Sequence, residues 1–157
     1  MASPRSTRPA TEHACSIHRS LDLLGEKWSL LIIRNALRGQ SRFSEFRDEL
    51  GIPSDVLTAR LGTLVEAGVL ERRSYREEGA RERFSYHLTE RGRSLKLVLI
   101  ALQQWSDEYN PFPGGVVSVV QEVGTGRHAS LALVSDDGDL LDEAAVEIAR
   151  GPAARTW

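Results

Sequence analysis

The sequence is poor in cysteine, because Cys15 is the only one among 157 residues. A disulfide within one chain is therefore excluded, and a zinc site built on the cysteines of one chain nearly so. Long apolar runs are missing too: the longest are Leu30–Ile33 and Leu97–Leu102, whereas a membrane-spanning helix needs about 20 residues. The polar first residues are not typical of a signal peptide. These absences predict a cytoplasmic protein of about one domain that folds without cofactor or metal.

Lysine is also scarce, at 2 of the 20 basic residues. Arginine suits phosphate recognition, but a GC-rich genome would produce the same excess. The charge is uneven, since residues 1–110 hold 17 basic and 15 acidic residues and residues 111–157 hold 3 and 7. The net charge of −2 neither requires nor excludes nucleic acid, so the local placement of charge must decide.

Apolar residues at helical spacing predict four helices in the first 68 residues. Residues 1–14 are expected to form a flexible arm. The helices are marked by Ile17, Leu21 and Leu24 before Gly25, by residues 28–37 before Gly39, by Phe43–Leu50 before Gly51, and by Pro53–Ala67 before Gly68. The last of them has a core stripe of Leu57, Leu61, Leu64 and Val65, and Pro53 suits its first turn.

After Gly68 the apolar period changes from 3.6 to about 2. Val69–Tyr75 and Arg83–Leu88 are expected to form a β-hairpin with a charged tip. Thr89 is expected to cap a long helix that runs to about Tyr109. Beyond Pro111, residues 116–123 and 128–135 predict a second strand pair, so residues 111–157 are expected to be a small β-rich extension. Residues 144–148 suit a short helix and a strand equally.

This order of elements predicts a mainly α fold with a small β-wing, the winged helix-turn-helix. The major groove of DNA admits one helix, so Phe43–Leu50 would brace the helix at Pro53–Ala67 while that helix reads base edges. We expect Ser54, Asp55, Thr58 and Arg60 to face the groove. We expect phosphates to be held by Arg42, Ser44, Arg76, Arg81 and Arg83. Acidic residues are interleaved in the hairpin, which weakens the basic patch.

Several short motifs together resemble one family. They are CSI at 15–17, LGEKWSLLII at 24–33, RFSEF at 42–46, VLTARL at 56–61, LVEAGVL at 64–70 and YHLTERG at 86–92. Residues 15–105 resemble the HxlR-type winged helix-turn-helix regulators of bacteria. The chain departs from that pattern at Glu26, where the family more often has glycine, and at Ala80, near a position usually held by proline.

The resemblance implies a homodimer at the nucleoid that binds a pseudo-palindromic operator and acts as a repressor. An unusually apolar terminal helix agrees with pairing between subunits. The expected dimer contacts are Ile17, Leu21, Leu95, Leu99, Leu102 and Trp105.

Cys15 matches the position at which some members of that family carry a thiol that senses oxidants or electrophiles. A thiol at the start of a helix feels the helix dipole, which favours the reactive thiolate. Packing of a small residue at the dimer contact is an equal alternative.

Two other functions stay open on the sequence. One is a regulator gated by a small ligand between the reading helix and the dimer helix, with Cys15 inert. The other is a winged-helix module that binds proteins. No phosphate loop, nucleophile elbow or metalloprotease helix occurs, so we do not expect an enzyme.

Overall fold

The computed structural model describes residues 14–76, 79 and 81–152. The chain forms two compact units, residues 1–94 and residues 95–157, which are described separately. The predicted N-terminal arm, apart from Ala14, lies outside the described residues. No helix among those residues is both long enough and apolar enough to cross a bilayer.

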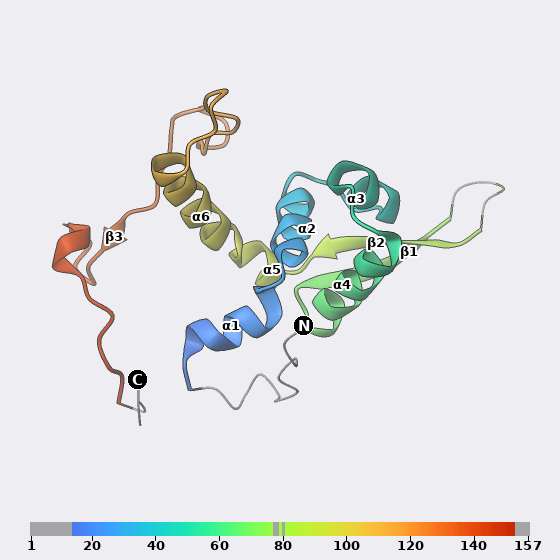
Figure 1. The fold of residues 1–157 in the computed structure, drawn as a ribbon, viewed down its shortest axis with the longest axis horizontal. Helices are drawn as coiled ribbons and strands as arrows, with labels where there is room; N and C mark the ends of the chain where they lie inside the picture. Colours follow the sequence, from blue (N-terminus) through green and yellow to red (C-terminus); the bar gives the residue numbers. More distant parts are fainter. Residues whose placement is uncertain (1–13, 77–78, 80, 153–157) are drawn as a thin grey trace. The chain divides into compact units, whose positions relative to one another are not determined.

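The first unit contains the four predicted helices in the predicted order (Figure 1). They are α1 (Ser16–Leu24), α2 (Lys27–Leu37), α3 (Phe43–Leu50) and α4 (Ser54–Glu66). Gly51 and Gly68 end the third and fourth helices with φ of 59° and 66°, left-handed values that glycine adopts at little cost. Pro53 is extended, with ψ of 139°, so it lies one position before the helix rather than in its first turn.

The predicted hairpin is present as β1 (Leu70–Tyr75) and β2 (Arg83–Leu88), paired antiparallel from Leu70–Leu88 to Tyr75–Arg83. The segment just before α3 pairs briefly with β2 on the side away from β1. Arg42 and Ser85 form an isolated bridge, and the Tyr86 N–H donates to the Ser41 carbonyl at 2.7 Å. The base of the wing is thereby joined to the start of α3, which the sequence did not predict.

The buried apolar core of the described residues lies between Leu24 and Leu70. It includes Ile32 and Ile33 from α2, Phe46 from α3, and Leu57, Leu61 and Leu64 from α4. All six are fully buried. Because α4 turns three leucines inward, its opposite face is held toward solvent by the packing of the whole unit.

The expected helix from Thr89 to Tyr109 is instead two helices, α5 (Glu90–Ser94) and α6 (Lys96–Tyr109). The cap is confirmed: Thr89 Oγ1 accepts the Gly92 N–H at 3.1 Å and also donates to the Gly68 carbonyl at 2.6 Å. The prediction of one continuous helix was wrong at Leu95, after the weak helix formers Gly92 and Ser94.

The second unit begins with α6, which buries none of its side chains fully. The strands of its extension are shorter than predicted and pair at other positions. The pair expected at 116–123 and 128–135 is reduced to one bridge, Gln121–His128, because those strands have little apolar partner surface and an isolated pair is unstable. Two-residue strands, β3 (Leu133–Val134) and β4 (Leu140–Leu141), flank a turn that holds three aspartates at 136, 137 and 139, and residues 143–145 form a 3₁₀ turn, η1.

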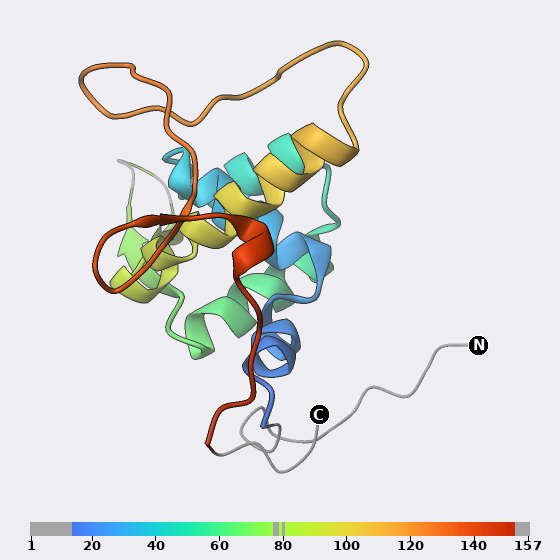
Figure 2. The same ribbon diagram turned by 90° about the vertical axis from the view of Figure 1, so that its left-hand side faces the viewer.

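Side-chain amides tie this extension to its own helix. Gln103 Nε2 donates to the Ser118 carbonyl at 2.9 Å, and Gln104 Oε1 accepts the Leu131 N–H at 2.8 Å. Figure 2 shows the long stretch with little regular structure that follows α6. The extension therefore depends on hydrogen bonds rather than on an apolar core.

Candidate nucleic-acid interface

The outer face of α4 carries small and polar side chains. Ser54, Asp55, Thr58, Ala59 and Gly62 are exposed along it. Gly62 has no other atoms within 4 Å of the place a Cβ would occupy. A helix whose outer face carries only short side chains can approach another surface closely, as a helix entering the major groove must.

Thr58 has a fixed orientation on this face. Its hydroxyl donates to the Ser54 carbonyl one turn earlier, at 2.7 Å. Oγ1 can still accept a hydrogen bond, while the methyl group is available for an apolar contact such as one with a thymine methyl.

Arg60 does not share the exposed face, although it was predicted to do so. Its side chain is 18% exposed, and Nη2 lies 3.8 Å from Glu26 Oε1 at the junction of α1 and α2. Arg60 therefore joins α4 to the preceding helices. It also accounts for Glu26, where the resembling family more often has glycine.

The start of α3 presents Arg42 and Ser44 to solvent. Glu45 closes this turn, because its Oε2 accepts the N–H groups of Ser41 and Arg42, both at 2.8 Å. Those two backbone hydrogen bonds lower the pKa of the Glu45 carboxyl. The turn is thus fixed by a carboxylate that stays ionised at neutral pH.

Aromatic rings support two of the arginines beside the wing. The Arg42 guanidinium lies over the Tyr75 ring at 5.0 Å, and that of Arg72 over the Phe84 ring at 4.2 Å. Such cation–π contacts orient a guanidinium without neutralising it. Arg72, Tyr75 and Phe84 were not among the predicted contact residues, although arginines and aromatics within two facing strands were a signal that could have indicated them.

The wing arginines differ in their surroundings. Arg76, Arg81 and Arg83 are exposed, whereas Arg73 forms a salt bridge with Glu71 on the same strand. Neither Arg81 nor Arg83 forms a salt bridge with a described residue. The structure therefore leaves the predicted phosphate-contacting arginines of the wing accessible while one neighbouring arginine is neutralised.

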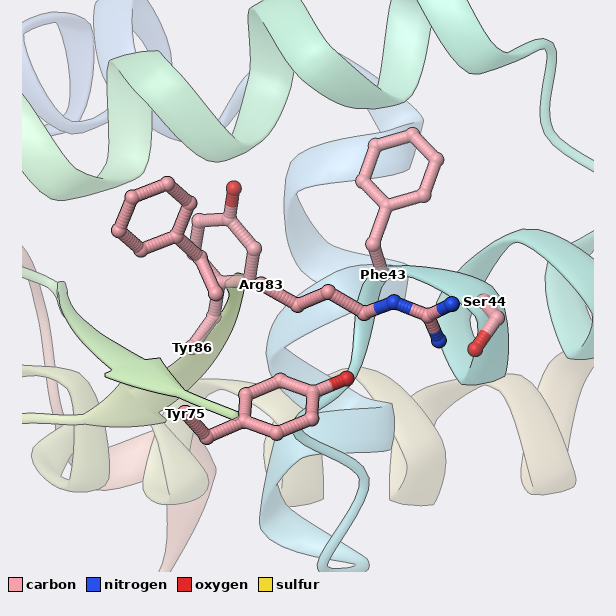
Figure 3. A pocket seen from close by; sticks show the side chains of 6 residues that line it. Phe43, Ser44, Tyr75, Arg83 and Tyr86 are labelled. Carbon is pink, nitrogen blue, oxygen red and sulfur yellow. The ribbon is translucent and has the colours of Figure 1, made fainter. Parts of the chain in front are cut away.

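A pocket of about 360 Å³ lies where the wing meets the start of α3. It is lined by Phe43, Ser44, Tyr75, Arg83, Phe84 and Tyr86. Figure 3 shows the Arg83 side chain extending toward Ser44, with the Tyr75 ring on one side of its guanidinium and the Phe43 ring on the other.

The predicted dimer residues are found on both units. Ile17 and Leu21 on α1 are 60% and 57% exposed, and Leu102 and Trp105 on α6 are exposed as well. Leu95 and Leu99 are partly exposed.

Cys15 is exposed and immediately precedes α1 as its N-cap residue. Its carbonyl accepts the Arg19 N–H at 3.1 Å, and the Arg19 guanidinium donates to Ala14 O and Ser16 Oγ on either side of it. The thiol thus has an accessible position with an arginine held nearby. Within the described residues, no cluster of three or more His, Cys, Asp and Glu side chains could hold a metal ion.

Residues 23–112 match the HxlR-like helix-turn-helix family. The chain belongs to this family. That span runs from the end of α1 to just beyond α6 and contains every element of the interface. The HxlR-like chain is accordingly a transcriptional regulator with a helix-turn-helix DNA-binding fold, not an enzyme.

Known relatives agree with this membership. An uncharacterized HTH-type transcriptional regulator of Mycobacterium tuberculosis is 42% identical over 119 residues, which cover 76% of this chain and 74% of that one. The crystal structure of PA1607 superposes with a TM-score of 0.78 at 32% identity, covering 90% of this chain and 98% of that one. The redox regulator HypR in its reduced form gives a TM-score of 0.55 at 28% identity, covering 60% and 92%.

Proposed function

We propose that this HxlR-like regulator is a homodimeric repressor acting in the cytoplasm, where it binds a pseudo-palindromic operator. One observation carries the proposal. The face of α4 that carries short, polar side chains lies in the same unit as exposed arginines at α3 and the wing, two of which contact aromatic rings. A helix that reads bases and cations that hold the phosphates on either side are the two parts that a groove-binding protein requires.

The roles divide by chemistry. Ser54, Asp55 and Thr58 face the base edges, because they lie on the exposed side of α4. Phosphates are held by Arg42, Ser44, Arg76, Arg81 and Arg83. Arg60 is left out of the contact set because it is engaged with Glu26.

The dimer forms through the exposed apolar side chains of α1 and α6. Exposed apolar side chains are unfavourable in water, and here they are Ile17, Leu21, Leu102 and Trp105. Covering them with a second copy of the chain stabilises the dimer by about 25 cal/mol per Å² of apolar surface buried. Two reading helices then meet half-sites about 34 Å apart along the DNA.

The direct test of DNA binding is fluorescence anisotropy with sheared genomic DNA, followed by selection of the bound fragments. Arg81→Ala should weaken binding to all sequences alike and lower the slope of log K against log salt by about 0.9 for one lost phosphate contact. Arg91→Ala is the matched control, because it removes the same charge from an exposed residue of α5 outside the contact set. Equal slopes for the two variants, or no DNA binding by the wild type, would contradict the proposal; in the second case the protein-interaction alternative becomes the leading account.

We further propose that Cys15 switches the repressor. In the presence of diamide, the Cys15 thiols of two subunits would join in a disulfide, giving two electrons and two protons to diamide, which becomes the hydrazine. The exposed thiol at the N-cap of α1 supports this step, as does the likeness to the redox regulator HypR. A tie next to the α1 dimer contact would change the geometry between the reading helices.

The switch is tested by adding diamide to the operator complex. The wild type should release DNA as a disulfide-linked dimer appears on non-reducing gels, and Cys15→Ser should do neither. Equal release by both proteins would refute the switch, as would a disulfide-linked wild type that stays on DNA. Either outcome leaves DNA binding itself intact as a proposal.

A further inference from the structure

The pocket between the wing and the start of α3 gathers a large share of the chain's aromatic residues. The sequence has only ten, as four phenylalanines, three tyrosines and three tryptophans. Four of these ten line this one pocket: Phe43, Tyr75, Phe84 and Tyr86. None of the four belongs to the buried core, in which Phe46 is the only aromatic side chain among the described residues.

These rings are partly open to solvent. Phe84 is 39% exposed, and the other three are half-buried. Packing of the hairpin against α3 therefore leaves aromatic surface uncovered. Covering the exposed part of these rings with a flat apolar group is favourable, because it removes aromatic surface from water.

The pocket also contains the cationic side chain of Arg83. Among the described residues, Arg83 has no salt-bridge partner, and its side chain runs along the pocket toward Ser44 (Figure 3). Glu45, a carboxylate in the first turn of α3, already accepts the Ser41 and Arg42 N–H groups. The guanidinium is thus available to a carboxylate, which it can bind through two parallel hydrogen bonds.

We propose that this pocket binds a planar aromatic carboxylate of about one ring. The ring would lie against Phe43, Tyr75 and Phe84, and the carboxylate would meet Arg83 and the Ser44 hydroxyl. The size agrees, since about 360 Å³ is at the small end of the range for ligand pockets. This site lies at the wing, so it differs from a ligand site between the reading and dimer helices.

Binding there would regulate the protein. This part rests on the proposed function, in which Arg83 also holds a DNA phosphate. A carboxylate on Arg83 would remove that contact, and the ligand would sit between the two elements that flank α4. The aromatic acid and the operator therefore compete.

The first experiment measures the ligand without DNA. Salicylate is titrated into the full chain labelled with ¹⁵N, and amide shifts are followed at Ser44, Phe84 and elsewhere. We expect saturable shifts at these residues with a dissociation constant of about 1 mM or below, and binding of neutral salicylamide about tenfold weaker. Arg83→Gln should weaken salicylate binding at least about tenfold, whereas the matched variant Arg91→Gln should bind like wild type.

Ring contacts are tested separately from charge. Phe43→Leu keeps Arg83 but removes one aromatic wall, so it should weaken salicylate severalfold while its spectrum shows a folded protein. Arg83→Lys keeps the charge but loses the planar fork and should fall between wild type and Arg83→Gln. Salicylate binding that is absent, or that is unchanged in both Arg83→Gln and Phe43→Leu, overturns the proposal.

The second experiment measures competition. Salicylate should release DNA from the wild type in proportion to pocket occupancy. It should release less DNA from Phe43→Leu at the same salicylate concentration, when each protein is assayed at its own dissociation constant for DNA. If DNA shifts the pocket resonances while salicylate shifts none, the pocket is part of the DNA interface only and the proposal fails. If salicylate binds as expected but no DNA does, the pocket stands and the proposed function fails.

Discussion

Among the glycines, Gly92 leaves the least room for a side chain. A Cβ at this position would lie 2.2 Å from the Val69 carbonyl oxygen and 2.8 Å from Leu88 Cδ2. Carbon and oxygen atoms rarely approach more closely than about 3.3 Å, so α5 and the Val69 peptide just before β1 would have to separate by about 1 Å. The obstacle is backbone, which cannot rotate out of the way as a side chain can.

The cost of Gly92→Ala follows from what that separation disturbs. Overpacking costs about 1–3 kcal/mol. The Val69 carbonyl also accepts the Thr89 N–H at 3.1 Å and the Thr89 hydroxyl at 3.2 Å. A hydrogen bond contributes about 1 kcal/mol to stability, and stretching these two loses a fraction of that contribution. Alanine returns about 0.5–1 kcal/mol through its higher helix propensity. We expect a net loss of about 2 kcal/mol.

Gly62→Ala is the matched control, because the same substitution meets nothing within 4 Å on the exposed face of α4. It should gain about 0.5–1 kcal/mol, so the two variants should differ in sign. The assay is urea unfolding followed by circular dichroism, at one fixed protein concentration because association contributes to stability. A Gly92→Ala protein as stable as wild type would show that α5 does not approach the Val69 carbonyl as closely as described.

Three further predictions concern association, recognition and pH. Leu102→Asp should give a monomer in sedimentation velocity and lose operator affinity, whereas Ile148→Asp, an equally drastic change at another exposed apolar residue, should do neither; a dimeric Leu102→Asp protein would remove α6 from the interface. Thr58→Ala should change base preference by about 1–3 kcal/mol at one position of the site, whereas Thr63→Ala, which loses the same kind of hydroxyl-to-carbonyl bond, should leave preference unchanged; identical preferences for both would exclude Thr58 from base contact. The pKa of Glu45 is lowered in the folded protein, so the stabilisation it contributes is present above its unfolded pKa of about 4.3 and is lost as pH falls through the lower folded value. Between pH 5 and about pH 3 the urea midpoint of Glu45→Gln should therefore fall less than that of the wild type. Parallel curves for the two proteins would refute this role.

The helices of the first unit were predictable because their signals are local. Leu57, Leu61 and Leu64 recur at helical spacing and are all fully buried. Arg60 was predicted to face outward, yet it is three residues after Leu57 and four before Leu64, which places it at the border of the inner face. Its helical position therefore already indicated partial burial, whereas the pairing with Glu26 is known only from the structure.

Features that depend on distant segments were not predictable in the same way. The bridge between Arg42 and Ser85 joins residues 43 positions apart, and the aromatic pocket exists only because that bridge brings Phe43 next to the wing. The strands expected after Pro111 failed for the opposite reason. Their β-branched residues favour an extended chain, but alternation alone does not supply the second layer that a sheet must cover.

The Thr89 hydroxyl has a consequence for how the wing can change. It joins the carbonyl that follows α4 to the first turn of α5, so both ends of the hairpin are pinned at one point. The segment between Gly68 and Thr89 is closed at this base and is held a second time where Ser85 and Tyr86 meet the segment before α3. Only the part beyond the Tyr75–Arg83 pair lies outside these two attachments, and doubling the length of a closed loop costs only about 0.6 kcal/mol in closure entropy. A longer or shorter chain beyond the Tyr75–Arg83 pair should therefore alter how far the wing reaches along DNA while the position of the reading helix stays the same.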